Sequence, residues 1–467
     1  MKISFHGAAQ MVTGSKHLLE LQDGTKVLFD CGMFQGNPEE ADILNRHFGF
    51  DPASINYLLL SHAHIDHCGL IPKLVKEGFD GNIYCTPATF DLARILLLDS
   101  AHIQEQDVVY HNKKRRQKNQ NPIHELYNKE DVESCLDRFV LVDYDEDFRL
   151  NNSLTLKFTD AGHILGSAAV HLSINDNGKK TRISFSGDVG RYNDELLKSP
   201  EAFEQCDYLI LESTYGSSLH EDLKIKDQKL LDAIRSTCIY KKGKLIIPSF
   251  SVGRTQELVY ALNRLDVTRQ LPEIDFYVDS PLSVQATNIM KQHQSMLNKK
   301  FQKYLKLDPE PFDFKRLTYI SSAESSRVLN DIDKPCVIIS ASGMADAGRV
   351  KHHIKHSIEN PKNTILFVGY CEPNSLGGKL MRNAKQVTIF GEPFEVKAEI
   401  QTIKSLSAHA DYDDLCQFIS CQNPELIKKL FIVHGEPEVQ EIFKRKLLRK
   451  GFLEVEIPAL HQAYQLY

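Results

Sequence analysis

The chain has 467 residues, of which 42% are hydrophobic and 25% are charged, and its formal net charge is -6 at pH 7. This length is too great for one compact core and predicts two or three domains. The acidic balance argues against attraction of nucleic acid to the whole surface, and no apolar run approaches the roughly 20 residues that span a bilayer.

Residues 1–7 lack the pattern of a signal peptide, and the ten cysteines form no C-x-x-C pair. Reduced thiols in a reducing compartment are therefore favoured over disulfides, and we expect a cytoplasmic protein.

The first part of the chain alternates short strand-like runs with turn residues. The expected strands are 3–5, 17–21, 26–29, 55–60, 82–85, 154–159, 168–174, 181–185 and 208–211. Most of them are followed closely by Gly, Asp or His. Polar groups therefore gather at strand ends, where α/β folds keep their chemistry.

From about residue 215, helix patterns alternate with apolar strand patterns. The expected helices are 226–240, 254–265, 281–292 and 349–358, and the expected strands are 244–248, 274–278, 335–339 and 364–368. This alternation predicts a parallel sheet covered by helices, in a second domain of α/β type.

After about residue 384 the chain returns to short strands, at 386–390, 394–403 and 430–433, followed by an amphipathic helix at 438–450. We expect segments 1–215 and 385–467 to form one domain interrupted by an inserted domain at 216–384. The reason is that the last segment carries residues that suit the site described next.

The run Ser61-His62-Ala63-His64-Ile65-Asp66-His67 follows the apolar stretch Tyr57-Leu58-Leu59-Leu60. The spacing of His62 and His64 places both rings on one face of an extended strand end, and Asp66 and His67 follow where the chain can turn. Imidazole and carboxylate suit zinc and related cations. The run predicts two metal sites that share one turn. Surface or capping histidines are the alternative, but burying four unligated polar groups would be costly.

Two metals need more ligands than this run supplies. Three further strand ends place a ligand-type residue beside a glycine: His163, Asp188 and His434. Each alone is more often a cap or turn residue, but together with the run they complete a set. Asp188 can bridge two cations through its two oxygens. Asp30 more naturally accepts a hydrogen bond from a ligand histidine and fixes its orientation.

This signature resembles the metallo-β-lactamase superfamily, because the pattern His62-x-His64-x-Asp66-His67 is accompanied by Asp30 and by the three later residues. The resemblance implies an αββα sandwich with two zinc ions. One zinc would be held by His62, His64 and His163, the other by Asp66, His67 and His434, with Asp188 bridging. Superfamily membership alone leaves the substrate open.

Four further motifs are similar to those of the β-CASP nucleases, the group that includes the RNA-cutting subunit of the cleavage and polyadenylation specificity factor and its prokaryotic relatives. These motifs are Glu212-Ser213-Thr214-Tyr215-Gly216, residues 248–257, Ser340-Ala341-Ser342-Gly343-Met344, and Ser407-Ala408-His409-Ala410-Asp411. The resemblance implies that an α/β β-CASP domain is inserted into the sandwich.

Glu212 matches the acidic motif A of this group, His409 the histidine of motif B, and His434 the histidine of motif C. His434 favours RNA as the substrate, because the DNA-acting branch usually carries valine there. Motif A is often aspartate, and segment 369–375 differs from the glutamine and alanine expected after Tyr370. For this reason we predict no substrate contacts in segment 369–375.

The implied activity is that of a zinc-dependent ribonuclease, in which a metal-bridged hydroxide attacks the RNA phosphodiester. Asp188, Glu212 and His409 are the expected catalytic residues. His409 would protonate the departing oxygen while Glu212 holds its ring, and the alternative role of His409 is to cap the helix expected at 412–421. The sequence leaves open whether cleavage is endonucleolytic or proceeds 5′–3′ from an end, and whether the metal is one other than zinc. The first rival is a small-molecule hydrolase of lactamase or thioesterase type, which does not need the inserted domain. The second rival is a metal-poor RNA-binding scaffold, against which the complete ligand set argues.

Candidate contacts to a substrate phosphate are Ser340, Ser342 and Gly343, at an expected helix N-terminus, and Arg254. A plain strand-to-helix turn and a surface arginine are the alternatives. The run 113–118 is either an RNA-contacting patch or a solvated helix end, and both interpretations stay open. The C-terminal helix and a sheet edge could mediate a homodimer, which nothing in the spacing demands.

Overall fold

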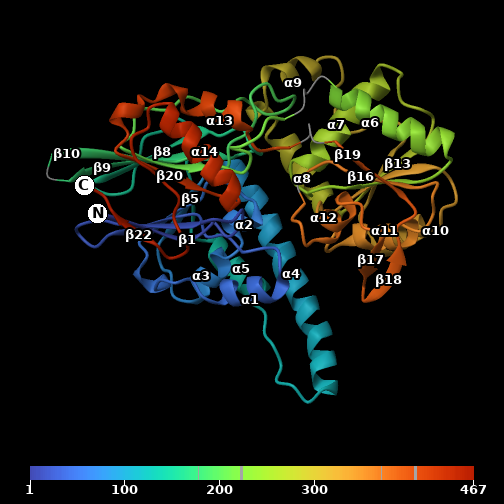
Figure 1. Ribbon diagram of the computed structural model, residues 1–467, viewed down its shortest axis with the longest axis horizontal. Helices are drawn as coiled ribbons and strands as arrows, with labels where there is room; N and C mark the ends of the chain where they lie inside the picture. Colours follow the sequence, from blue (N-terminus) through green and yellow to red (C-terminus); the bar gives the residue numbers. More distant parts are fainter. Residues whose placement is uncertain (177, 221–224, 370, 404–406) are drawn as a thin grey trace. The chain divides into compact units, whose positions relative to one another are not determined.

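The computed structural model describes residues 1–176, 178–220, 225–369, 371–403 and 407–467 (Figure 1). The chain forms two compact units. Unit 1 consists of Met1–Leu219 and His409–Tyr467, and unit 2 consists of His220–Ala408. Unit 1 is therefore built from both ends of the chain.

Unit 1 contains two seven-stranded sheets. The first has the order β22-β1-β2-β3-β4-β5-β6, with β1 Lys2–Gly7, β2 Lys16–Glu20, β3 Lys26–Phe29, β4 Tyr57–Leu59, β5 Asn82–Cys85, β6 Phe139–Leu141 and β22 Ala463–Gln465. The second has the order β21-β20-β11-β10-β9-β8-β7, with β7 Phe148–Arg149, β8 Leu154–Asp160, β9 Ala168–Asp176, β10 Lys179–Phe185, β11 Tyr208–Glu212, β20 Lys429–Val433 and β21 Val455–Glu456.

The two sheets bury a common core. Phe29 of the first sheet and Phe158 and Phe185 of the second belong to one cluster of fully buried side chains. Because side chains alternate across a strand, the opposite faces of both sheets also need cover. The C-terminal segment joins the sheets by a parallel pairing of β20 with β11 and an antiparallel pairing of β22 with β1.

Helices cover the outer faces of the sheet pair. These are α1 Pro38–Arg46, α2 Ile65–Cys68, α3 Ile71–Lys76, α4 Pro87–Gln117, α5 Lys129–Leu136, α13 Tyr412–Phe418 and α14 Pro437–Arg449. Figure 1 shows α13 and α14 on one side and α1, α3 and α5 on the other. Leu415 of α13 and Phe443 of α14 pack with Leu211 of β11 in a second buried cluster. The expected αββα sandwich is confirmed.

Unit 2 is a parallel sheet covered by helices, which confirms the inserted α/β domain. The strand order is β14-β13-β15-β12-β16-β19. The strands are β12 Leu245–Pro248, β13 Asp275–Asp279, β14 Leu317–Ile320, β15 Cys336–Ser340, β16 Thr364–Phe367 and β19 Glu399–Thr402. The helices are α6 Lys226–Ile234, α7 Arg254–Val267, α8 Pro281–Gln292, α9 Lys299–Tyr304, α10 Ala323–Asp331, α11 Arg349–Ser357 and α12 Leu376–Met381, and a hairpin joins β17 Gln386–Ile389 to β18 Glu392–Glu395.

The structure differs from the expected boundary at 384/385. The strand expected at 394–403 is two strands, β18 and β19, and β19 pairs in parallel with β16 of the inserted sheet. Val387 and Ile389 of the hairpin are buried in the core of unit 2. Short strands alone do not tell to which sheet they belong. The chain therefore returns to unit 1 at His409, and not at residue 385.

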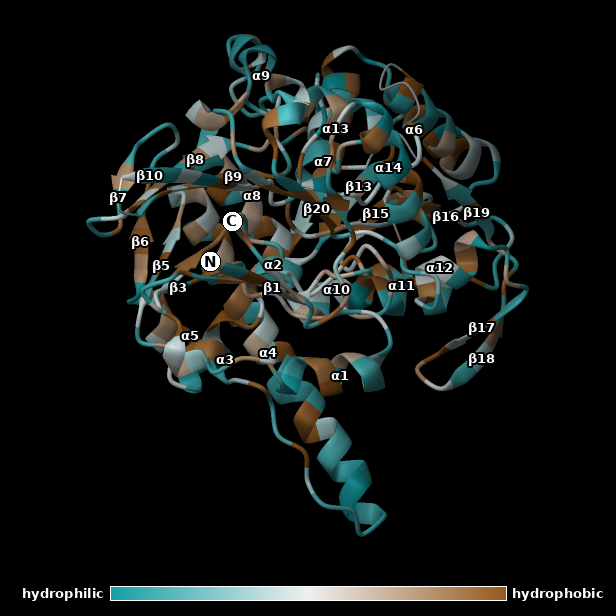
Figure 2. Cartoon of the chain, turned by 60° about the vertical axis from the view of Figure 1, so that its left-hand side comes forward, coloured by the Kyte–Doolittle hydropathy of each residue, from teal (hydrophilic) through white to brown (hydrophobic). Residues whose placement is uncertain are grey.

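The 31-residue helix α4 was not expected from the sequence. Its N-cap Thr86 accepts a hydrogen bond from Thr89 N, and its buried residues all lie between Ala88 and Ala101. The second half has no buried face and therefore no hydrophobic periodicity to detect. Figure 2 shows this outer half as largely hydrophilic. Among the described residues, no helix combines the length and apolar character needed to cross a bilayer.

The core between the sheets of unit 1 predicts the cost of a truncation. Phe158 is fully buried there, so Phe158→Ala should lower the free energy of unfolding by about 3–5 kcal/mol through lost burial and a residual cavity. Leu141→Ala is the control: Leu141 is 47% exposed, so the change should stay within about 0.5 kcal/mol. Chemical denaturation of both variants measures the difference, and equal losses would contradict this view of the core.

Candidate metal centre

The ligand-type side chains meet where strands of both sheets of unit 1 end. His62 and His64 follow β4, and Asp66 and His67 lie in α2. His163 follows β8, Asp188 follows β10 and His434 follows β20. Residues separated by more than 360 positions thus reach one place, because β20 is inserted beside β11 in the sheet that also contains β8 and β10.

A close backbone approach fixes the turn that carries Asp66 and His67. The carbonyl oxygen of Asp66 accepts a hydrogen bond from Ser15 N at 2.8 Å, and that of His67 accepts one from Cys31 N at 2.8 Å. A Cβ atom on Gly32 would lie 1.6 Å from the Asp66 oxygen. Only glycine allows this approach, so the segment after β3 acts as a backbone support for α2.

The first cluster consists of His62, His64, His163 and Asp188, whose ligand atoms all lie within 4.8 Å of one another. His64 Nδ1 lies 3.2 Å from His62 Nε2 and 3.2 Å from His163 Nε2. Zinc–nitrogen bonds of about 2.0–2.1 Å in a tetrahedral site place their nitrogens about 3.3 Å apart. The spacing of these rings therefore fits a four-coordinate cation.

The second cluster consists of Asp66, His67 and His434. His434 Nε2 lies 3.3 Å from His67 Nε2 and 3.4 Å from Asp66 Oδ2. Asp188 faces both clusters: its Oδ2 lies 3.5 Å from His62 Nε2, and its Oδ1 lies 3.3 Å from His67 Nε2. Oδ1 is buried and has no hydrogen-bond partner of good geometry within the described chain. This carboxylate is placed to serve two cations, one through each oxygen.

Burial sets the protonation of the histidines in the first cluster. Burial and neighbouring histidines hold the pKa of His62 and His163 well below the usual value, and burial lowers that of His64 to about 4. Burial opposes ionisation of Asp188, but His434 and His67 outweigh it and hold the pKa of Asp188 well below its usual range. Neutral imidazoles beside an ionised carboxylate are the protonation states that bind a divalent cation.

Asp30 contacts one of the candidate ligand histidines, His67. Its Oδ2 lies 2.6 Å from His67 Nδ1, and its two oxygens accept hydrogen bonds from Ser61 N at 2.8 Å and Ser61 Oγ at 2.9 Å. With Nδ1 of His67 directed at Asp30, Nε2 is the nitrogen that faces the second cluster. Carboxylates of this kind set the tautomer and angle of a ligand ring.

Thr214 plays the corresponding part for His434, and sequence reasoning missed it. Its Oγ1 lies 3.0 Å from His434 Nδ1 and also donates to the His434 carbonyl oxygen at 3.2 Å. The only sequence feature that could indicate this role of Thr214 is its place two residues after Glu212, in the same motif. The partner of a ring nitrogen depends on strand pairing, which here places β11 beside β20.

Glu212 and His409 form a pair whose ligand-type atoms also lie within 4.8 Å of those of Asp188 and His434. His409 Nδ1 lies 3.2 Å from Glu212 Oε1 and 3.8 Å from Asp188 Oδ2. Glu212 is fully buried, and its oxygens also accept from Val189 N at 2.7 Å and Thr214 N at 3.1 Å. Burial alone would lower the pKa of His409, but the carboxylates of Glu212 and Asp188 raise it to about 9. These two carboxylates therefore favour the protonated form of His409.

The N-cap of α13 is Asp411, and not His409. The Asp411 side chain accepts from the backbone N–H groups of Asp413 and Asp414 in a capping box. The alternative role for His409, a helix cap, is therefore filled by another residue.

The four candidate phosphate contacts lie in unit 2 and are not equivalent. Ser340 is buried and donates from Oγ to the carbonyl oxygen of Asp279 at 2.8 Å, and Arg254 is buried and paired with Glu257. These two side chains are engaged within the unit. Ser342 and Gly343 lie in the turn between β15 and α11, where Ser342 is partly buried and Gly343 is buried.

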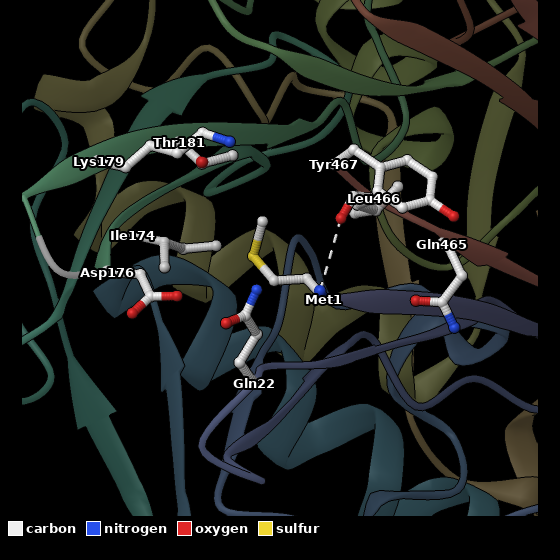
Figure 3. A pocket seen from close by; sticks show the side chains of 9 residues that line it. All are labelled: Met1, Gln22, Ile174, Asp176, Lys179, Thr181, Gln465, Leu466 and Tyr467. Atoms are coloured by element: carbon white, nitrogen blue, oxygen red, sulfur yellow. Dashed lines mark hydrogen bonds between the residues drawn. The ribbon is translucent and has the colours of Figure 1, made fainter.

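A cavity of about 400 Å³ on unit 1 is separate from the metal centre (Figure 3). Its lining comes from both termini and from β9 and β10: Met1, Gln22, Ile174, Asp176, Lys179, Thr181, Gln465, Leu466 and Tyr467. None of the ligand-type residues lines it.

Comparison with known proteins agrees with this arrangement. Three family models match: the metallo-β-lactamase superfamily at residues 17–232, the Beta-Casp domain at 255–380, and the Zn-dependent metallo-hydrolase RNA specificity domain at 393–458. The chain belongs to the β-CASP family of the metallo-β-lactamase superfamily, which confirms the resemblance seen in its motifs.

Individual relatives match over nearly the whole chain. Ribonuclease TTHA0252 of Thermus thermophilus is 33% identical over 94% of this chain and 94% of its own length. An RNase J-like protein of Methanocaldococcus jannaschii is 32% identical over 93% of this chain and 92% of its own. The transcription termination factor FttA of the same organism is 30% identical over 96% of this chain and 70% of its own.

The hydrogen bond between Asp30 and His67 predicts a loss of metal affinity on substitution. Asp30→Asn should weaken zinc binding about 10- to 100-fold, because the ligand ring loses its anionic partner. Competition with a chromophoric chelator measures the affinity. Asp147→Asn is the control, because Asp147 is exposed on the same unit and only pairs with Lys157. Equal affinities of the two variants would show that Asp30 does not support the ligand.

Proposed function

We propose that this protein is a zinc-dependent ribonuclease that hydrolyses RNA phosphodiester bonds, with endonucleolytic and 5′–3′ exonucleolytic cleavage as the two modes to be separated by experiment. One observation carries the proposal: His409, whose ring faces the buried Glu212, lies 3.8 Å from Asp188 at the junction of the His/Asp clusters. The names of two relatives, a ribonuclease and an RNase J-like protein, support the same conclusion.

Two zinc ions fit the donor set. In the proposal His62, His64 and His163 hold one ion, and Asp66, His67 and His434 hold the other, with Asp188 shared. When bound, such ions supply a hydroxide at neutral pH and neutralise charge on the phosphate. Asp30 and Thr214 keep the rings of His67 and His434 turned toward the ions.

His409 supplies the proton that the departing oxygen needs. In the imidazolium form both ring nitrogens carry a proton, and Nδ1 is directed at Glu212. We assign Nε2 as the donor to the oxygen that leaves phosphorus as the new P–O bond forms on the opposite side. When the His409 ring takes up a proton again, Glu212 stabilises the cationic form. The burial of Glu212 strengthens this ion pair, because little water screens it.

RNA is favoured over small substrates by the chain outside the metal centre. A lactamase or thioesterase has no need of an inserted parallel-sheet unit of this size, and His434 stands at a position where the DNA-acting branch usually carries valine. The family model at 393–458 is named for RNA specificity. All proposed metal ligands come from one chain. A cytoplasmic location accords with ten free cysteines.

Substrate class can be tested directly. The zinc-loaded protein should cleave labelled RNA but neither nitrocefin nor a thioester, and cleavage of only the last two would overturn the proposal. Mapping product ends from a 5′-triphosphate RNA and a 5′-monophosphate RNA then separates the two modes. Internal ends from both substrates indicate an endonuclease, and processive loss from the monophosphate alone indicates a 5′–3′ exonuclease.

His409 should be separable from metal binding. His409→Ala should keep its zinc while its kcat on RNA falls about 10²- to 10⁴-fold, the usual contribution of a positioned proton donor. Asp188→Ala is the contrast, because it should lose metal together with activity. Metal analysis and single-turnover kinetics measure both variants. Loss of zinc from the His409 variant would place this residue among the ligands.

A further inference from the structure

Helix α4 ends in a strongly basic segment, which we call the basic tip and define as residues 108–124. Five cations occur within it, Lys113, Lys114, Arg115, Arg116 and Lys118, and the segment contains no Asp or Glu. Figure 1 shows this end of α4 extending away from the sheets of unit 1. The cluster is local, since the whole chain carries a net charge of -6.

The basic tip is a built element. Asn112 Nδ2 donates to the carbonyl oxygen of Ile123 at 2.9 Å, and Asn112 Oδ1 accepts from Ile123 N at 2.8 Å. Arg115 Nε donates to the carbonyl oxygen of Asn121 at 2.5 Å. These bonds fix the returning chain against the helix. Arg115 therefore supports the turn, while the other four cations are exposed.

The exposed cations are not used inside the protein. Among the described residues, none of the ion pairs includes Lys113, Lys114, Arg116 or Lys118. Basic residues in a last helical turn stabilise the helix dipole, but that effect falls off within the turn and does not account for Lys113 or Lys118.

Apolar and aromatic side chains accompany the charges. Tyr110 is 54% exposed and Val109 is 68% exposed, and Lys114 Nζ lies 4.3 Å from the centre of the Tyr110 ring. A shallow hollow of about 570 Å³ runs along this face, lined by Val108, Val109, Asn112, Lys113, Arg116 and Gln117. A basic surface with an exposed aromatic ring is the pattern that binds single-stranded nucleic acid through phosphates and stacked bases.

The other end of α4 lies beside the metal centre. Thr86, its N-cap, donates from Oγ1 to the carbonyl oxygen of Gly166 at 2.7 Å, and Gly166 is three residues from His163. A helix of 31 residues is about 46 Å long, at 1.5 Å per residue. The basic tip is thus too far away to touch a phosphate held at the metal centre.

We propose that the basic tip is a docking site for the phosphate backbone of single-stranded RNA, distinct from the metal centre, that holds a distant part of a long substrate. The inference rests on the proposed ribonuclease function. It explains how a net-acidic protein attracts a polyanion, because the cations are concentrated on a projecting helix instead of spread over the surface.

The test uses two full-length variants with the same change in net charge. The tip variant carries Lys113→Gln, Lys114→Gln, Arg116→Gln and Lys118→Gln and leaves Arg115 in place. The control carries Lys2→Gln, Lys129→Gln, Lys179→Gln and Lys180→Gln, which are scattered over other elements of unit 1. Binding of labelled phosphorothioate poly(U) is measured over a series of salt concentrations, and turnover is measured on long RNA and on a tetranucleotide.

The tip variant should bind poly(U) at least about tenfold more weakly, and the slope of log K against log salt should become shallower by about 2 to 3, since each lost phosphate contact contributes about 0.7. KM on long RNA should rise, while turnover of the tetranucleotide, which cannot reach the tip, should equal that of wild type. The control should match wild type throughout.

Equal affinity and equal salt slope for the tip variant and wild type would overturn the inference. Binding to phosphatidylglycerol vesicles is measured as well. If the tip variant loses vesicle binding but still binds poly(U) as wild type does, the inference is overturned and the tip is assigned to a membrane surface. If wild type binds poly(U) more tightly than the tip variant does but cleaves no RNA, the docking site is supported and the ribonuclease function is refuted. The two failures are therefore distinguishable.

Discussion

The shared carboxylate of Asp188 is the constraint on which the metal centre depends. It is buried at the junction of two histidine clusters, with one oxygen 3.5 Å from His62 Nε2 and the other 3.3 Å from His67 Nε2. An ionised carboxylate in such a place is costly unless positive charge compensates it. Neighbouring histidines, first among them His434 and His67, supply part of this compensation and hold the pKa of Asp188 well below its usual range, and the proposed cations would add positive charge at the same place.

The fold supplies this centre with fixed donors by using backbone contacts. Gly32 lets the segment after β3 approach the Asp66 carbonyl, so α2 is fixed before any metal binds. Asp30 and Thr214 each direct one nitrogen of a ligand ring, and Glu212 is held by two backbone N–H groups while it faces His409. Because these hydrogen bonds already hold the side chains in place, substrate binding would require little rearrangement of them.

Much of the centre could be predicted from the sequence, because metal ligands occur at strand ends and strand ends carry local signals. The run 61–67 and the residues His163, Asp188 and His434 each follow an apolar stretch, and the structure brings all of them together. Features that depend on pairing between distant strands could not be predicted. Thr214 is informative only once β11 lies beside β20, and the segment 385–408 belongs to unit 2 only because β19 pairs with β16. The outer half of α4 has no buried face, and so it gave no periodic signal.

Unit 1 takes strands from both ends of the chain, and this has a consequence for biosynthesis. A ribosome releases the first cluster early, since His62, His64, His163 and Asp188 all precede residue 189. His409 and His434 emerge only after the whole of unit 2 has been made. The two groups of side chains can therefore meet only after unit 2 has been synthesised, and the candidate metal centre cannot be assembled before then.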